Sequence, residues 1–265
     1  MDVSVKSSSH LNAVASIGQT TLDLVQEMGR MALFLFQGAL AMVTPPFRFQ
    51  LLLKQISFIG IHSLFVIVLT AVFTGMVLGL QGYYTLSRFG SEALLGPAVA
   101  LSIIRELGPV LTGLMVTGRA GSALTAELGI MRIREQVDAL HAMGINPIKY
   151  LVAPRMEAGL LVLPLLTAIF DLVGIYGGYL VAVQLLGMSS GTYFGGIETA
   201  LLPKDLWVGL LKAFSFGLII TWVCTYKGYT TSRGAEGVSR STTSAVVLSS
   251  VLILVWDYFV TSVML

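Results

Sequence analysis

The sequence predicts an all-α polytopic membrane protein with five transmembrane helices, an N-terminal interfacial amphipathic helix and a short charged helix outside the membrane. Two observations carry this prediction. Hydrophobic residues make up 55% of the 265 residues and charged residues only 11%, and the mean hydropathy is +0.84, which soluble domains rarely reach. The apolar residues also gather in segments of about 20 residues or more, the length at which a helix crosses a bilayer.

The composition argues against several other classes of protein. A net charge of +2 without a dense basic run offers no surface for nucleic acid. The single cysteine, Cys224, lies in an apolar segment, so we expect a buried thiol and neither a disulfide framework nor a thiolate metal site. The sequence has no G-x-x-x-x-G-K-[ST] loop and does not hydrolyse ATP by that mechanism. We expect no catalytic residue, cofactor or metal.

The first 54 residues are expected to lie outside the bilayer core. Residues 1–10 are polar and serine-rich, which is typical of a flexible tail. Residues 11–54 are expected to form an amphipathic helix and a linker, with Pro45-Pro46 ending the helix. Its most apolar part, residues 31–43, is too short to cross a hydrocarbon core, so the helix is expected to lie on the membrane surface.

The first two predicted spans differ in charge. Residues 59–80 carry no charged side chain and contain glycines at 75 and 79, a spacing that allows two helices to approach closely. Residues 97–126 are apolar but contain Arg105, Glu106 and Arg119. Charged groups inside a membrane segment avoid lipid, so these three are expected to face other helices or a polar path.

Each remaining span carries one charged residue. Asp171 lies in residues 158–186, Lys212 in residues 206–226 and Asp257 in residues 244–265. Intramembrane charges commonly pair with one another, so Arg119, Asp171 and Asp257 are interpreted as members of polar seams between helices, with a functional role left open.

A charged segment separates the second and third spans, and a helix is predicted at about residues 128–145. Apolar residues recur at spacings of three and four, which is typical of a helix with one apolar face: Ile130, Ile133, Val137 and Leu140. Arg134, Glu135 and Asp138 point away from that face, and Arg134 and Asp138 stand at i, i+4, where opposite charges stabilise a helix. Asn146-Pro147 ends it.

The distribution of positive charge predicts the orientation. Lysine and arginine gather before the first span, in the central segment and between the fourth and fifth spans, whereas the other loops hold only Arg88 and Lys204. The positive-inside rule therefore predicts a cytoplasmic N-terminus and, after five crossings, a C-terminus on the other side. Arg105 and Lys212 then lie in the outer half of the bilayer, where they can pair with Glu106 and Asp257 or receive an anionic head group.

Several ordered motifs resemble those of the MlaE (YrbE) permease family. They are residues 73–83 (FTGMVLGLQGY), 105–109 (RELGP), 118–123 (GRAGSA), 135–136 (EQ), 143–147 (MGINP) and 154–155 (PR). The resemblance covers most of the chain from about Arg30. It implies a transmembrane permease domain over residues 55–265, in the bacterial inner membrane, that belongs to an ABC-type system moving phospholipid between the inner and outer membranes and maintaining outer-membrane lipid asymmetry.

The resemblance also implies partners and roles. The partners are a second copy of the permease in a homodimer, cytoplasmic ABC ATPase subunits, a STAS-domain protein and a periplasmic ring of MCE-domain subunits, with phospholipid as substrate. The charged helix would be the coupling helix that receives the motion of the ATPase. Arg105, Glu106 and Lys212 are candidates for the polar part of the lipid path, and Leu78 for its apolar part.

Two alternatives remain open at this stage. A membrane scaffold would bind the ATPase and the ring without a lipid path of its own, and Arg105 and Lys212 would then be structural. An ion-coupled secondary transporter would be expected to show inverted repeats and unwound helices carrying carboxylates, and the sequence shows no clear repeat.

Overall fold

The computed structural model describes residues 4–45 and 48–264, and within them it is helical with no strand. Five helical segments are long and apolar enough to cross a membrane: Phe49–Ser87, Glu92–Ile133, Ile148–Leu185, Pro203–Tyr229 and Ala235–Met264. The predicted fold class is confirmed. Each segment is longer than the predicted span, because helical hydrogen bonding continues into the polar flanks.

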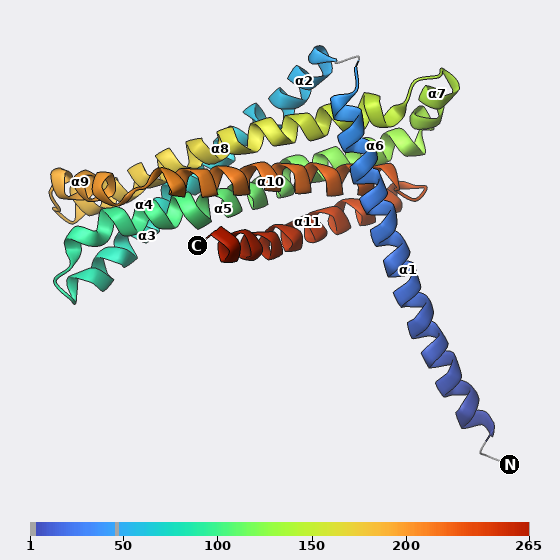
Figure 1. The fold of residues 1–265 in the computed structure, drawn as a ribbon, viewed down its shortest axis with the longest axis horizontal. Helices are drawn as coiled ribbons and strands as arrows, with labels where there is room; N and C mark the ends of the chain where they lie inside the picture. Colours follow the sequence, from blue (N-terminus) through green and yellow to red (C-terminus); the bar gives the residue numbers. More distant parts are fainter. Residues whose placement is uncertain (1–3, 46–47, 265) are drawn as a thin grey trace.

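The long helices lie side by side, and helix α1 (Ser4–Val43) crosses them steeply near one end (Figure 1). Helix α7 (Gln136–Ala142) lies at that end, and helix α9 (Ser190–Ala200) lies at the other. We call these the α7 end and the α9 end. A helix transverse to five candidate spans has the direction expected of a surface helix.

Helix α1 begins at Ser4, so it includes most of the segment expected as a flexible tail; residues 1–3 lie outside the described part. Residues 4–17 contain no glycine or proline that would end a helix. Near its other end α1 packs Met31 and Phe34 against the bundle, and the Trp222 Nε1 donates a hydrogen bond of 2.9 Å to the Met31 carbonyl. These contacts fix α1 on the bundle.

The first span is α2 (Phe49–Ile59), the short 3-10 helix η1 (Ile61–Ser63) and α3 (Leu64–Ser87), so helix already begins within the predicted linker. Helix α3 packs closely on α8 (Ala153–Tyr179) at the predicted glycines. A Cβ added to Gly75 would lie 1.8 Å from the Gly174 carbonyl oxygen. The two backbones therefore touch, which only glycine permits at this position.

The second span contains two π-helical turns. It consists of η2 (Glu92–Leu94), α4 (Leu95–Ser102), π-helix η3 (Ile103–Leu107), α5 (Gly108–Val116), π-helix η4 (Thr117–Gly121) and α6 (Ser122–Ile133). Arg105 and Glu106 lie in η3, and Arg119 lies in η4. A π-helical turn holds an extra residue and rotates the next turns of the helix, so Arg105 and Arg119 are aimed at different neighbours.

Helix α8 occupies the middle of the bundle and contacts α3, α5 and α10 (Pro203–Tyr229). It is preceded by π-helix η5 (Ile148–Val152) and followed by π-helix η6 (Leu180–Leu185). The fifth span, α11 (Ala235–Met264), packs on α10 and α6 and has one of the most open surfaces of the five. The face of α11 away from α10 is therefore available to lipid or to another chain.

Candidate functional site

Lys212 lies at the centre of a charge cluster between η3, α10 and α11. Its side chain is completely buried, and its Nζ lies 2.6 Å from Glu106 Oε2 and 2.9 Å from Asp257 Oδ1. The contact with Asp257 is an ion pair rather than an aligned hydrogen bond. The same Nζ donates hydrogen bonds of 2.7 Å to Thr261 Oγ1 and 2.9 Å to the Arg105 carbonyl. Lys212 thus pairs with Glu106 and Asp257, which is one of the two possibilities that the sequence left open.

Arg105 faces the start of α10. Its Nη2 lies 2.7 Å from Asp205 Oδ1, and its Nε donates a second bond of 2.9 Å to the same oxygen. Asp205 also accepts a bond of 3.0 Å from the Leu202 N–H through Oδ2, which holds the first turn of α10. Sequence reasoning missed Asp205; its signal was an acidic residue in the first turn of a helix that starts with proline.

The members of the cluster differ in exposure. The side chain of Glu106 is 37% exposed and that of Arg105 is 30% exposed, whereas Lys212 is enclosed. A ligand that approaches the cluster therefore meets Arg105 and Glu106 first. Lys212 holds Glu106 and Asp257 in place from behind.

Arg119 connects the second span to the first. Its Nη1 donates a bond of 2.5 Å to the Phe58 carbonyl and one of 3.3 Å to Ser63 Oγ, and its guanidinium lies 5.1 Å from the Phe58 ring centroid. This contact falls where α2 gives way to η1 and α3, so Arg119 satisfies backbone groups at a helix break.

The two carboxylates of the predicted seams differ. Asp257 pairs with Lys212, as expected. Asp171 has no ion pair among the described residues, and it lies against Gly108 at the start of α5. The expected pairing of Asp171 is therefore not found, because the cations at this depth, Arg105 and Lys212, are held by other carboxylates.

An apolar groove runs along α10 and α11 beneath α1. It consists of two adjoining cavities of about 710 and 430 Å³, which share Trp222 and Leu252. The first opens near Lys227, which is paired with Glu27 of α1. The second is lined by Ser215, whose Oγ donates a hydrogen bond of 2.8 Å to the Lys212 carbonyl, so this cavity ends beside the charge cluster. The walls between are apolar: Met28, Met31, Val247, Val251, Leu218, Ile219, Val255 and Trp256.

Leu78 lies on the opposite side of the bundle, on α3. It is half-buried and packs against the core, while its neighbours Phe73 and Val77 are exposed. The structure thus puts Leu78 on the flank of an apolar outer face and does not bring it to the groove of α10 and α11.

The charged segment after the second span is two helices rather than the single helix predicted over residues 128–145. Helix α6 ends at Ile133, and Glu135 takes a left-handed conformation with φ of 57° before α7 begins. Arg132, not Arg134, pairs with Asp138, at 2.6 Å. The turn breaks the i, i+4 spacing on which the predicted Arg134–Asp138 pair depended.

The turn also changes which face of the segment is open. Val137 is completely buried with Leu128 and Leu151, and Leu140 packs against them, so this part of the predicted apolar stripe binds the chain's own helices. Ile133 is half-buried. The exposed side chains of the segment include Ile130, Arg134, Glu135, Asp138 and Met143.

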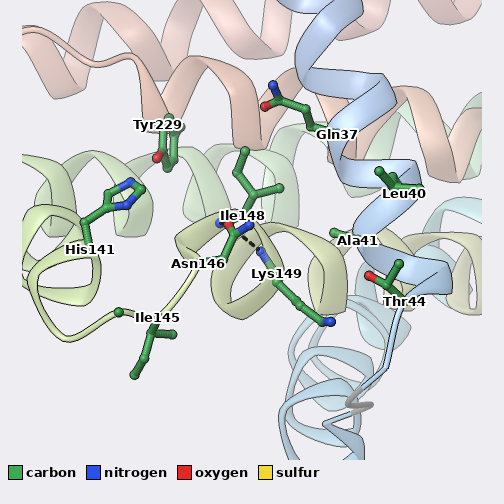
Figure 2. Close-up of a pocket in the computed structure, with 11 residues that line it drawn as sticks. Gln37, Leu40, Ala41, Thr44, His141, Ile145, Asn146, Ile148, Lys149 and Tyr229 are labelled. Carbon is green, nitrogen blue, oxygen red and sulfur yellow. Dashed lines mark hydrogen bonds between the residues drawn. The ribbon is translucent and has the colours of Figure 1, made fainter.

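A recess of about 700 Å³ lies beside α7, between the last turns of α1, the loop after α7 and the end of α10. Figure 2 shows His141 and Tyr229 on one side of it and Leu40, Ala41 and Thr44 of α1 on the other. Asn146 Oδ1 accepts bonds from the Ile148 and Lys149 N–H groups, at 2.9 and 3.4 Å, which starts η5 after the predicted stop. Lys149 Nζ donates to the Pro45 carbonyl, so the recess has a fixed wall.

A five-span helical bundle with a buried charge cluster, a lateral apolar groove and a short helix at one end fits the class of membrane permeases. The Permease MlaE family model matches residues 52–263, and the chain belongs to this family. The family resemblance of the motifs is thereby confirmed.

Named relatives support the same class. The chain is 46% identical over 251 residues to a probable ABC transporter permease protein of Rickettsia bellii, covering 95% of this chain and 97% of the relative. It is 39% identical over 255 residues to the intermembrane phospholipid transport system permease protein MlaE of Haemophilus influenzae, and the match covers 96% of this chain and 98% of the relative. It is 40% identical over 210 residues to the chloroplastic protein TRIGALACTOSYLDIACYLGLYCEROL 1 of Arabidopsis thaliana, covering 79% and 60%. The chain is an ABC transporter permease and a multi-pass inner membrane protein.

Proposed function

We propose that this permease moves phospholipids between the inner and outer membranes, driven by ATP hydrolysis in a partner subunit, and so maintains the lipid asymmetry of the outer membrane. The observation that carries the proposal is the apolar groove that ends beside a charge cluster. A phospholipid has two apolar tails and an anionic head, and needs both kinds of surface. The identity to the phospholipid permease of Haemophilus influenzae, over nearly the whole chain, supports the same substrate.

The α7 end is cytoplasmic in this proposal. Arg132 and Lys227 lie in the last turns of α6 and α10, Arg134 and Arg233 follow these helices, and Lys149 lies in η5 before α8. These ends of α6, α8 and α10 lie toward α7 (Figure 1), and the positive-inside rule associates such a gathering of positive charge with the cytoplasm. The N-terminus is then cytoplasmic and the C-terminus periplasmic, and the charge cluster lies in the periplasmic half of the bilayer.

In the lipid path, the tails lie in the groove of α10 and α11, and the head group meets Arg105. The carboxylate of Glu106 partly neutralises the positive charges of Arg105 and Lys212. The anionic head group therefore binds weakly enough to be released. The Lys212 side chain is buried and does not contact the lipid. It positions Glu106 and Asp257 instead. Leu78 and the exposed face of α3 form an apolar surface on the other side of the bundle. In a homodimer this surface faces the second copy of the chain and lines the apolar part of the lipid path.

The coupling role falls to α7 and the turn before it. The exposed side chains Ile130, Arg134, Glu135 and Asp138 form the surface that contacts the ATPase, while Ile133, Val137 and Leu140 lock the segment onto the bundle. The second span runs without a loop from this segment to Arg105, so a push on α7 reaches the charge cluster through α6, η4, α5 and η3. The family implies a STAS-domain protein and a periplasmic MCE-domain ring as further partners.

A groove-filling variant tests the lipid path. In Val251→Trp the indole occupies the first cavity, and we expect less phospholipid to co-purify with the protein, measured by mass spectrometry, and slower lipid transfer between liposomes when the ATPase is present. Val263→Trp is the matched control, because Val263 is on the same helix and is 84% exposed. Normal lipid content in Val251→Trp, with transport intact, would favour the scaffold alternative.

A further inference from the structure

Asp171 is a carboxylate in the third span with no hydrogen bond or ion pair at Oδ1 among the described residues. A Cβ added to Gly108 would lie 1.9 Å from this oxygen, so the missing side chain at Gly108 makes room for the carboxylate. The same added Cβ would lie 2.9 Å from the Ile103 carbonyl oxygen, so a backbone oxygen of π-helix η3 faces the same space. Asp171 Oδ1 therefore has no described donor, and the Ile103 carbonyl oxygen beside it accepts the Gly108 N–H of the π-helical turn and keeps a second lone pair.

Two threonines of the same interface are also unpartnered. Seven threonines are buried in the described part of the chain, and five of them donate to the carbonyl four residues earlier: Thr117, Thr125, Thr221, Thr225 and Thr231. The hydroxyls of Thr112 and Thr167 do not, and have no partner among the described residues, although these residues are only 0% and 2% exposed. Their lone pairs and protons are therefore free for a ligand.

The helical register brings these groups together. Helices α5 and α8 run antiparallel, with Ile103 against Gly174 and Gly108 against Asp171. This register places Thr112 of α5 and Thr167 of α8 one turn further along the contact, because residues four apart lie on the same helical face. The interface thus holds a carboxylate, two hydroxyls and a backbone carbonyl within about two turns.

No described cation neutralises this carboxylate. Helix α3, which also packs on α8, has no charged residue, and Arg105 of η3 and Lys212 of α10 are paired with Asp205, Glu106 and Asp257. Arg155 and Glu157 of α8 lie at its other end. An ionised carboxylate at membrane depth needs a cation beside it.

We propose that Asp171, Thr112 and Thr167, with the Ile103 carbonyl, form an intramembrane site for a small monovalent cation, either a proton or a sodium ion. Carboxylate, hydroxyl and carbonyl oxygens are the hard ligands that such cations take. The bound cation bridges α5 and α8, so it stabilises the segment of the second span that joins α7 to Arg105. The site goes beyond the lipid path and does not depend on which lipid is carried.

The test is thermal unfolding of the full chain in detergent, at constant ionic strength, in sodium chloride and in choline chloride, from about pH 5 to about pH 9. A sodium site raises Tm with sodium concentration at high pH. A proton site gives a Tm that is highest at low pH and falls as pH rises, with no effect of sodium. For either cation, Asp171→Asn is expected to weaken the dependence of Tm on sodium concentration or on pH, because asparagine has the same shape as aspartate but no charge.

Two threonine variants keep the proposal testable if Asp171→Asn does not fold. Thr112→Val and Thr167→Val remove a ligand at nearly constant volume, and each is expected to reduce the cation-dependent shift in Tm. Thr117→Val is the matched control, because the Thr117 hydroxyl bonds to its own helix, and it should retain the full shift. A wild-type Tm that responds to neither ion, or a response unchanged by all of the Asp171, Thr112 and Thr167 variants, would overturn the site.

Discussion

Lys212 Nζ lies 2.6 Å from Glu106 Oε2, and no part of the Lys212 side chain is accessible. The ammonium group is therefore the internal partner of two carboxylates, Glu106 and Asp257, that come from different spans. This relationship ties the second, fourth and fifth spans together at one depth.

Removing the ammonium should destabilise the bundle strongly. In Lys212→Met both carboxylates lose their cation, and breaking a buried pair from one side costs about 3–5 kcal/mol. We expect a lower Tm in detergent, whereas Lys204→Met, which removes an exposed lysine of the same helix, should leave Tm unchanged. Adding Glu106→Gln to Lys212→Met should restore part of the loss; a double variant no more stable than the single one would contradict this account.

Contact between α3 and α8 should depend on the absence of a side chain at Gly75. In Gly75→Ala the new methyl group would lie 1.8 Å from the Gly174 carbonyl oxygen, so the helices must separate, at a cost of about 1–3 kcal/mol. Gly118→Ala is the control, since a Cβ there meets nothing within 4 Å. Unfolding of both variants should show a loss for Gly75→Ala alone, and equal Tm values would show that the contact is loose.

The surface around the turn before α7 should affect the ATPase rather than the fold. Glu135 is exposed, so Glu135→Lys should leave Tm unchanged while reducing ATPase binding and stimulation in the reconstituted complex. Glu236→Lys, at an exposed glutamate at the start of α11, controls for a change of charge at the same end of the bundle. Full stimulation by Glu135→Lys would remove this residue from the coupling surface.

The spans were predictable because apolar length is a property of the sequence alone. The pairing of Lys212 with Glu106 and Asp257 was predictable too, since buried charges need partners and few were available. Asp205 could not be found in this way: its role depends on a π-helical turn that aims Arg105 at the start of α10, and such turns leave no periodic signal.

The charged segment shows a different limit. Its three- and four-residue spacing predicts one helix with one apolar face, yet Glu135 breaks the helix and Val137 of that face is buried. Periodicity shows that a face is apolar, and it does not show whether that face binds the chain's own helices or a partner. Only the packing of Leu128 and Leu151 against Val137 decides this.

Tyr193, in α9 and outside the candidate spans, should make stability depend on pH. Its hydroxyl donates a bond of 3.0 Å to the Ile175 carbonyl, and burial raises the pKa of Tyr193 above its ordinary value. As pH rises, the tyrosine ionises in the unfolded chain before it ionises in the folded chain. The stabilisation is therefore complete below about pH 10 and is lost as pH rises further.

Tyr193→Phe should weaken the loss of Tm at alkaline pH and, by removing one hydrogen bond, lower Tm at neutral pH by the equivalent of about 1 kcal/mol. Tyr258→Phe, at a tyrosine that is 72% exposed, should change neither value, and equal alkaline profiles for Tyr193→Phe and wild type would show that Tyr193 ionises freely in the folded protein.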